Sequence, residues 1–497
     1  MNRIILALSI FAMFTQCKEP PNTEVQINID ASQIIHTMKG GMGASWHALE
    51  KEIPLENEKY KYTVREVGSR GSAYGGNPPV SDTLVWNQIK NYAEWLGLNF
   101  IRVEIDQRMY EPKRKKFDWT SEEMQALYHI LDYAEKSGAD VFLQQMCGDI
   151  EWNSYPGVHP IISAPKSLDD FTDGIATLLE HLTKTKGYTC IKYFCMTNEP
   201  PGGTWGYWWE YGDNPGSIND AWERLKEKFD ARGISIPISG PDWTDMPPFE
   251  KDKLSFSKYL GSIDIHSYHG VTKEGEANLK QWADWSHSQN KPFFLTEYGN
   301  MNLGWGTDNP APKSFEAALS NANDVIRTLR AGADGVNRWS FINRGDLDGQ
   351  WQLIKTFNRD NKTCLKEVKP ENEAYYGFGI ISRFLSKYSS TVSCKISQPD
   401  SVLIPLALLS PSNELSIFIL NQSDEEQVIS LNIDNLPKKI MNIYQITKEL
   451  VANPDFELNA IHKFNSTKSE KLVLPARSIT TVSSYALKNN DKGTTNQ

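Results

Sequence analysis

One pattern constrains the fold more than any other. Between residues 40 and 387, a short apolar run precedes a longer amphipathic stretch eight times. The short runs are typical of buried strands, and apolar residues spaced three and four apart are typical of helices covering a sheet. The expected strands cover residues 41–47, 99–105, 140–146, 192–197, 236–241, 263–267, 293–297 and 335–341. The expected helices cover residues 84–96, 121–137, 168–185, 220–231, 279–288, 315–331 and 373–386, with a weaker one near 256–260.

This alternation predicts an α/β protein with a parallel sheet. Eight β-α units in about 350 residues suit a (β/α)8 TIM barrel with insertions. A doubly wound sheet would carry a glycine-rich phosphate-binding turn after its first strand, and Gly40-Gly41-Met42-Gly43 lacks that spacing. We therefore expect the barrel to occupy residues 35–387.

A second domain is expected because 497 residues exceed what one hydrophobic core usually serves. Short alternating segments beyond residue 388 predict an accessory antiparallel β-sandwich over residues 388–487. Residues 24–29 alternate in the same way, so we expect residues 17–34 to hold a linker and an N-terminal strand joining the sandwich. The polar residues 488–497 are expected to form a disordered tail.

The first sixteen residues are interpreted as an export signal. Arg3 supplies positive charge, and an apolar stretch too short to span a bilayer follows it. The stretch resembles a bacterial lipoprotein signal, with Cys17 as the lipidated first residue of the mature chain. Gln16 stands where that pattern prefers a small residue, so ordinary secretion and an uncleaved anchor are the alternatives. The expected location is outside the cytoplasm, on the cell surface or the periplasmic side, with only a lipid anchor in the membrane.

The remaining cysteines and the net charge limit which kinds of protein this chain can be. Five cysteines follow Cys17, an odd number without a ladder of spacings, so no disulfide framework is expected. Cys364 and Cys394 are candidates for one disulfide, and the other three are interpreted as buried thiols. A net charge of −10 argues against nucleic acid as a partner, because such binding depends on neutralising phosphates.

Two glutamates stand out as candidate catalytic residues. Asn198-Glu199-Pro200 ends the fourth expected barrel strand, and Glu297 ends the seventh. Active sites of such barrels lie at the carboxyl ends of the strands, where these two strands face each other across the mouth. Two carboxyl groups facing each other over a cleft can cleave a glycosidic bond. A lone glutamate at a strand end is more often a cap or an ion-pair partner.

This arrangement resembles the clan A glycoside hydrolases, which are retaining enzymes with a (β/α)8 barrel. The resemblance implies that Glu199 is the general acid/base and Glu297 the nucleophile, while Asn198 binds the sugar 2-hydroxyl. It also places Arg102 beside the nucleophile and His266 with Tyr268 on the sixth strand, where Tyr268 would donate a hydrogen bond to Glu297.

Within clan A, the sequence is most similar to glycoside hydrolase family 30, with families 39 and 79 as near alternatives. Family 30 joins its barrel to a β-domain built from both chain ends. The stretches that look similar are 39–43 at the first strand, 375–378 and 382–384 in the last barrel helix, and 475–478 near the end of the sandwich.

Aromatic residues are expected to bind sugar rings, because sugar faces stack on them and the chain has 15 Trp and 20 Tyr. Trp339 at the end of the eighth strand matches the aromatic platform of the clan. Trp152, Trp205 and Trp305 are expected in the cleft because they follow strand ends. Trp243 and Arg338 are weaker candidates for the same cleft.

The predicted function is therefore hydrolysis of an oligo- or polysaccharide by double displacement through a covalent glycosyl-enzyme. No cofactor and no metal are expected, since His47, His266 and His269 lack compact ligand spacing. A surface lipoprotein that binds glycans without cleaving them and a transglycosylase using the same residues are the alternatives. The sequence assigns no oligomeric state.

Overall fold

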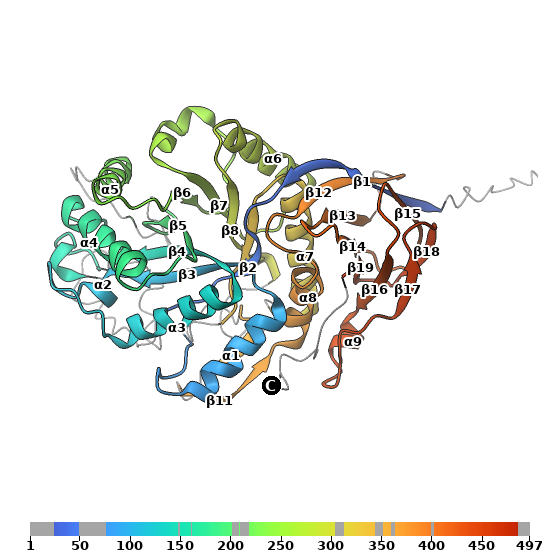
Figure 1. Cartoon of the computed structure of the whole chain (residues 1–497), viewed down its shortest axis with the longest axis horizontal. Coiled ribbons are helices and arrows are strands. Elements are labelled where there is room, and N and C mark those ends of the chain that lie inside the picture. The colour runs from blue at the N-terminus through green and yellow to red at the C-terminus, as the bar shows by residue number, and fades with distance from the viewer. Residues whose placement is uncertain are drawn as a thin grey trace, which may run out of the picture.

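The computed structural model describes residues 24–48, 76–147, 150–160, 162–200, 208, 218–303, 313–342, 351–358, 363–398 and 402–485. Figure 1 shows two parts, a barrel of strands surrounded by helices and a strand-rich domain, with α7 (Phe315–Arg330) and α8 (Asn372–Ser382) lying between them.

The barrel is a closed parallel sheet of eight strands. They are β2 (Gly41–Ala44), β3 (Phe100–Asp106), β4 (Asp140–Cys147), β5 (Ile191–Cys195), β6 (Ile238–Trp243), β7 (Ser262–Ser267), β8 (Phe293–Tyr298) and β9 (Gly335–Arg338). The sheet order is β2-β9-β8-β7-β6-β5-β4-β3. Backbone hydrogen bonds from Asn99 N to Met42 O (3.0 Å) and from Trp46 N to Arg102 O (2.8 Å) close the ring between β2 and β3. The predicted (β/α)8 barrel is confirmed.

The glycines near the first barrel strand have a steric cause. A Cβ atom added at Gly43 would lie 1.3 Å from the carbonyl oxygen of Phe100, so only glycine allows β2 to approach β3 this closely. Inside the barrel, the rings of Phe100 and Phe294 stack with centroids 5.0 Å apart and fill the floor below the strand ends. The close approach of β2 therefore depends on a missing side chain.

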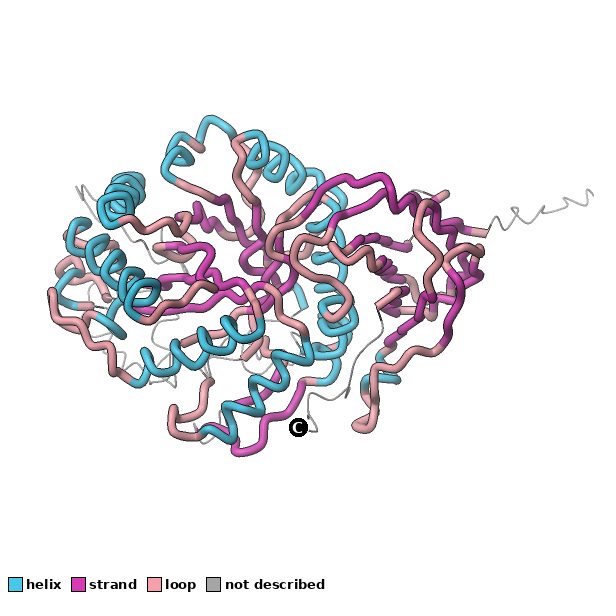
Figure 2. The backbone as a smooth tube through the Cα atoms, viewed as in Figure 1, coloured by secondary structure: helices cyan, strands magenta, loops and turns pink. Residues whose placement is uncertain are grey.

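Helices cover the barrel from outside, as Figure 2 shows in cyan. Besides α7 and α8, the helices around the barrel are α1 (Thr83–Leu96), α2 (Gln107–Tyr110), α3 (Glu122–Ser137), α4 (Leu168–Glu180), α5 (Ile218–Arg232) and α6 (Lys273–Ser288). Helix α6 begins six residues before the predicted start, because Thr272 caps its amino end by accepting a hydrogen bond from Gly275 N. The weak helix expected near 256–260 is a 3₁₀ turn at Ser255–Tyr259. Within the described residues, every helix is too short or too polar to cross a bilayer.

The second domain is a nine-stranded sheet with the order β17-β16-β19-β14-β13-β12-β1-β15-β18. Its strands are β1 (Val25–Thr37), β12 (Ser390–Ile396), β13 (Leu403–Leu409), β14 (Leu415–Asn421), β15 (Gln427–Asp434), β16 (Ile440–Ile446), β17 (His462–Asn465), β18 (Glu470–Leu474) and β19 (Ser478–Ser483), with α9 (Lys448–Val451) after β16. The N-terminal strand joins this domain as predicted. It pairs antiparallel with β12 but parallel with β15, so the sheet is only mostly antiparallel.

The two faces of this sheet bury two different cores. On β14, Ile417 and Ile419 point into a core inside the strand-rich domain, while Phe418 and Leu420 alternate with them and join the core of the barrel helices. Tyr444 on β16 belongs to the same shared core, and its ring lies 4.6 Å from that of Phe384. The strand-rich domain is therefore packed onto the barrel through α7 and α8.

Two features of the described chain differ from the sequence prediction. A hairpin of β10 (Ile354–Asn358) and β11 (Thr363–Pro370) follows the last barrel strand and was not predicted. The proposed Cys364–Cys394 disulfide was wrong, because both thiols are free and lie in different sheets. Cys364 on β11 instead donates to the Asn77 carbonyl at 3.0 Å. Cys190 and Cys195 are buried thiols, as expected.

Candidate active site

The two candidate glutamates lie together at the carboxyl ends of opposite strands. Glu199 follows β5, the fourth barrel strand, and Glu297 lies near the end of β8, the seventh. One carboxylate oxygen of each and one ring nitrogen of His266 lie within 4.8 Å of one another. Glu297 is buried, whereas Glu199 is partly exposed. The sequence prediction thus places both carboxyl groups correctly at one site.

Glu297 is held by three side chains, one from β3, one from β7 and one from the residue that directly follows β7. Arg102 on β3 places Nη1 2.5 Å from Oε1, and the Tyr268 hydroxyl donates a hydrogen bond to Oε2. The Nδ1 atom of His266 on β7 lies 3.4 Å from the same Oε2. The contacts expected from Arg102 and Tyr268 are both present. Three donors around one carboxylate fix its orientation and favour its ionised form.

Glu199 approaches the same histidine from the other side. Its Oε1 lies 2.8 Å from His266 Nδ1, and its backbone N–H donates to Asp242 Oδ2 at 3.3 Å. The backbone of Glu199 has φ of 47°, in the left-handed region that non-glycine residues rarely adopt. Asp242, with φ of 58°, lies in the same region. Such conformations cluster at functional sites, where the surrounding contacts maintain them.

A buried polar network below these carboxylates was missed by the sequence reasoning. Arg102 Nη1 lies 2.6 Å from Glu104 Oε1, and the other oxygen of Glu104 lies 2.6 Å from His47 Nδ1. On the opposite side, His266 Nε2 lies 2.9 Å from Asp242 Oδ1. The positions of Glu104 and Asp242 in the sequence could have indicated both residues. Glu104 is two residues after Arg102 on the same strand face, and Asp242 lies at the carboxyl end of β6.

Burial and charge act against each other in this network. Burial raises the pKa of Glu297 to about 7 against the lowering effects of Arg102 and His266, while Glu199 and Glu104 raise it further. Burial alone would lower the pKa of His266, but Glu297 and Asp242 raise it well above its usual value. Burial would likewise raise the pKa of Asp242, but His266 and Arg102 lower it. A protonated His266 between ionised Asp242 and the glutamate pair follows from these directions.

Two further residues named from the resemblance also lie at this site. Asn198 accepts a hydrogen bond from Arg102 Nη2 at 2.7 Å, so the arginine connects it to Glu297. The Trp339 ring lies 5.0 Å from that of His47, and the Arg102 guanidinium carbon lies 5.9 Å from it. Trp339 also packs in a small cluster with Tyr268 and Trp351. Both residues are therefore next to the carboxylates.

The remaining aromatic candidates differ in outcome. Trp152 follows β4 and donates to the Glu111 carbonyl at 3.4 Å, so a cleft role for it stays a prediction. Trp205, Trp305 and the lipidation candidate Cys17 lie outside the described residues.

Two weaker candidates contact other side chains and backbone rather than the two glutamates. Trp243 packs edge-on against Phe256 and Trp282, in the core of the helical layer. Arg338 is fully buried and lies between the sheet and the outer helices, beside Ala318 and Phe378. A role in the cleft stays a prediction for both residues. The side chains of a strand alternate between the two faces of the sheet, and the strand end alone does not fix which face a residue occupies.

The donor atoms of Glu199, His266 and Glu297 are of the kind that bind metals. However, the guanidinium of Arg102 lies 2.5 Å from Glu297 and supplies positive charge where a cation would sit. The geometry therefore favours a carboxylate pair balanced by arginine and histidine.

Comparisons with known proteins were made for the sequence and for the fold. Residues 66–341 match the family model described as "Cellulase (glycosyl hydrolase family 5)". Among curated proteins, no sequence is similar enough to this chain to count as a match.

Three solved structures show the fold. A family 30 endoxylanase from Clostridium papyrosolvens C71 has 15% identity and a TM-score of 0.62, with 93% of this chain and 100% of that chain covered. A family 30 subfamily 8 xylanase from Clostridium acetobutylicum has 16% identity and a TM-score of 0.59, with 93% and 100% covered. A conserved exported protein from Bacteroides fragilis has 16% identity and a TM-score of 0.63, with 92% and 100% covered.

Proposed function

Because the chain belongs to the cellulase family of glycoside hydrolases (glycosyl hydrolase family 5), we propose that it cleaves an oligo- or polysaccharide with retention of anomeric configuration. The chain is a glycoside hydrolase with the clan A fold, as its sequence predicts. The retaining mechanism and the roles of individual residues are the proposal. No observation favours the glycan-binding or transglycosylase alternatives over hydrolysis.

The observation that carries the proposal is the separation of the two carboxyl groups. Oxygens of Glu199 and Glu297 lie within 4.8 Å of each other. Retaining glycosidases hold their carboxyl groups about 5–5.5 Å apart, whereas inverting enzymes need about 6.5–9.5 Å to admit a water molecule between sugar and base. The short separation supports direct attack by one carboxylate on the sugar.

In the first proposed step, a Glu297 oxygen attacks the anomeric carbon while the bond to the leaving oxygen breaks. Protonated Glu199 gives its proton to that leaving oxygen. In the second step, Glu199 accepts a proton from water, the water oxygen attacks the anomeric carbon, and the bond to Glu297 breaks. Glu297 is the more buried of the pair and contacts Arg102, which suits the nucleophile. Partly exposed Glu199 suits proton exchange with water.

The surrounding residues have supporting roles in this proposal. Tyr268 and Arg102 orient Glu297 for attack, because each contacts a different carboxylate oxygen. Since the Asn198 side-chain oxygen accepts from Arg102, its amide N–H groups remain to bind a sugar hydroxyl. Trp339 supplies an aromatic face beside the pair.

The test measures turnover and product stereochemistry. Wild type is assayed on aryl β-glycosides and arabinosides, and the anomer released first is followed by NMR. We expect retention of configuration and loss of turnover in Glu297→Ala. Glu199→Ala should lose about 10²–10⁴-fold on poor leaving groups and less on good ones, since only the former need a proton.

Azide separates the two roles. Azide should rescue Glu199→Ala by giving a glycosyl azide of retained configuration, and should give the opposite configuration with Glu297→Ala. Glu123→Gln is the matched control, because Glu123 is also a buried barrel carboxylate but pairs with Arg108 on the barrel exterior. Inverted wild-type product, or full turnover in Glu297→Ala, would reject the mechanism.

We also propose that the protein is exported and lipidated at Cys17. The supporting features are the charged and apolar residues before Cys17. Mass spectrometry of the mature protein and membrane fractionation should show an acylated Cys17 in wild type and a released protein in Cys17→Ser. An unmodified, membrane-free wild-type protein would reject this assignment.

A further inference from the structure

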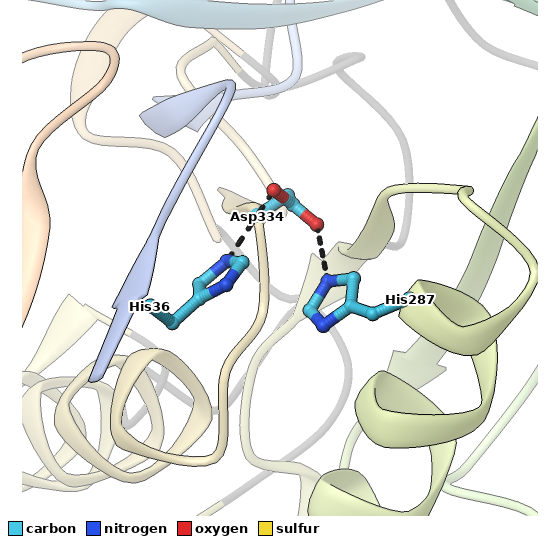
Figure 3. A group of neighbouring side chains, drawn as sticks. All are labelled: His36, His287 and Asp334. Atoms are coloured by element: carbon cyan, nitrogen blue, oxygen red, sulfur yellow. Dashed lines mark hydrogen bonds and ion pairs between the residues drawn. The ribbon is translucent and has the colours of Figure 1, made fainter. Parts of the chain in front are cut away.

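A second cluster of ionisable side chains lies at the opposite end of the barrel from Glu199 and Glu297. His36 lies on β1, His287 lies in the last turn of α6, and Asp334 directly precedes β9 at the amino end of that strand. Figure 3 shows both imidazole rings directed toward the two oxygens of Asp334. Three segments far apart in the sequence thus converge on one buried carboxylate.

Only some of the polar atoms in this cluster have hydrogen-bond partners. His287 Nε2 lies 2.8 Å from Asp334 Oδ2, which also accepts from the Phe293 backbone N–H at 2.9 Å. In contrast, His36 Nε2 and Asp334 Oδ1 face each other at 3.4 Å, and both atoms are buried without a hydrogen-bond partner. Unsatisfied buried polar atoms are costly and call for a specific cause. Here the two atoms occur together, on neighbouring ligand-type groups.

The spacing suits a tetrahedral metal ion. Zinc binds nitrogen and oxygen ligands at about 2.0–2.2 Å, so two ligands on one tetrahedral ion lie about 3.3–3.5 Å apart. The distance between His36 Nε2 and Asp334 Oδ1 is 3.4 Å. One ligand atom from each of the three residues lies within 4.8 Å of the others. A small rotation of His287 would bring its Nε2 to the same centre.

Charge and exposure agree with a cation site. Asp334 supplies a carboxylate whose two oxygens each face one of the histidines, Oδ1 toward His36 and Oδ2 toward His287. Asp334 is 1% exposed, while the side chains of His36 and His287 are 19% and 31% exposed. The carboxylate is therefore buried behind two histidines that are open to solvent on one side. An ion could therefore reach the carboxylate past the histidines.

We propose that His36, His287 and Asp334 bind a divalent transition-metal ion of the zinc class, with water as the fourth ligand. Two imidazoles and one carboxylate favour such an ion over Ca²⁺ or Mg²⁺, which prefer oxygen ligands. On binding, the Nε2 lone pairs of both neutral imidazoles point at the ion, and their protons reside on Nδ1. The ion would join β1 of the strand-rich domain to α6 and the start of β9.

The test measures metal uptake by the full chain. Protein treated with a chelator is titrated with ZnCl₂ by calorimetry, and bound zinc is counted by mass spectrometry after dialysis. We expect one equivalent in wild type, with affinity at least about tenfold weaker in His36→Gln and in His287→Gln. Co²⁺ should give the intense visible absorption of a tetrahedral ion in wild type only. Zinc should also raise the thermal midpoint of wild type, because the ion binds the folded state.

Two controls distinguish this cluster from other metal-like groups. His462→Gln removes an exposed histidine that pairs with Glu470 at 3.1 Å on another edge of the molecule, and uptake should not change. Glu297→Gln alters the active-site group of carboxylates, and uptake should again persist. Glycosidase activity and circular dichroism verify that His36→Gln and His287→Gln are folded.

No uptake by wild type, or equal uptake in wild type and both histidine variants, would overturn the proposal. The cluster would then be a hydrogen-bonded contact between β1 and the barrel. Because uptake is measured without substrate, this outcome is independent of the glycosidase mechanism.

Discussion

Asp242 shows how a fully buried residue influences the charge of the Glu199 and Glu297 pair. Asp242 Oδ1 lies 2.9 Å from His266 Nε2, and His266 Nδ1 lies between Glu199 and Glu297. The charge on Asp242 favours protonated His266, and that positive charge in turn lowers the pKa of Glu297. Asp242 is therefore a positioning residue that acts through the histidine.

The first prediction at this scale concerns pH. Because burial raises the pKa of Glu297 to about 7, the ionised form that we propose as the nucleophile is lost as pH falls through that value. The expected kcat/KM profile of wild type therefore declines on its acid side with an apparent pKa near 7. A profile that is flat down to pH 5 would contradict this ionisation of the free enzyme.

The second prediction tests Asp242 directly. In Asp242→Asn, His266 loses its ionised partner and its positive charge is disfavoured, so the pKa of Glu297 rises. We expect the acid limb of kcat/KM to move to higher pH, with a smaller change in KM than in kcat.

Asp264→Asn is the matched control for that variant. Burial and the neighbouring Asp242 raise the pKa of Asp264 well above its usual value, so an amide removes less negative charge here than it does at Asp242. The acid limb of the kcat/KM profile of Asp264→Asn should therefore have nearly the same apparent pKa as that of wild type. Equal shifts in both variants would show a packing effect instead.

The residues at the strand ends were largely predictable, and the residues beneath them were not. Glu199, Glu297, Arg102, His266 and Tyr268 converge because the carboxyl ends of parallel strands meet at one barrel mouth. The roles of Glu104 and Asp242 were not predicted, because a single carboxylate in a strand looks in the sequence like any polar residue within an apolar run. Its meaning emerges only when the ring of strands brings a histidine or arginine beside it.

At the scale of elements, β2 is the least tolerant strand of the barrel. It has four residues, and a Cβ at Gly43 would overlap the Phe100 carbonyl of β3. The sequence predicted this strand but placed its end three residues later, at 47. The chain continues to bond as a strand would, with Ala48 N donating to Glu104 O at 3.0 Å. The periodicity of apolar residues predicted that a strand is present here. Where a strand or helix ends depends on caps and on hydrogen bonds between residues far apart in the sequence.

The third prediction follows from that contact. Gly43→Ala should destabilise the protein by more than about 3 kcal/mol, because a backbone-to-backbone overlap cannot be relieved by a side-chain rotation. Gly138→Ala is the matched control. It has no neighbour within 4 Å of the added Cβ, and its φ of 75° gives a cost of about 1 kcal/mol. Urea denaturation followed by circular dichroism compares the two, and equal costs would contradict the overlap argument.

At the scale of the whole molecule, barrel and strand-rich domain share one core. Phe418 on β14 and Tyr444 on β16 belong to the core that the barrel helices form, where Tyr444 packs on Phe384 just after α8. The Thr481 hydroxyl of β19 donates to the Ile380 carbonyl of α8 at 2.6 Å. The side chain of Arg330 on α7 also donates to the Pro405 carbonyl of β13 at 3.3 Å. These contacts indicate that neither domain is complete without the other.

The fourth prediction is that the two domains unfold together. Tyr444→Ala should cost about 3–5 kcal/mol and lower the midpoint of one calorimetric transition for the whole chain. As a control, Val473→Ala on β18 removes a side chain that is 47% exposed and should change the midpoint little. Two separate transitions, with only one moved by Tyr444→Ala, would contradict a shared core.

The position of β1 in the interior of the nine-stranded sheet determines when during folding this strand can pair. Gln26 N bonds to the side chain of Ser397, 371 residues further along the chain, and Ile27 pairs with Ile396. A ribosome adding about 5–20 residues per second needs about 20–70 s to supply that partner. The eight barrel strands lie between these two partners in the chain, so β1 has no antiparallel partner in the sheet until β12 is available. The first strand to be made is thus among the last to dock, and a holding factor or slow-folding mutant would act on this segment first.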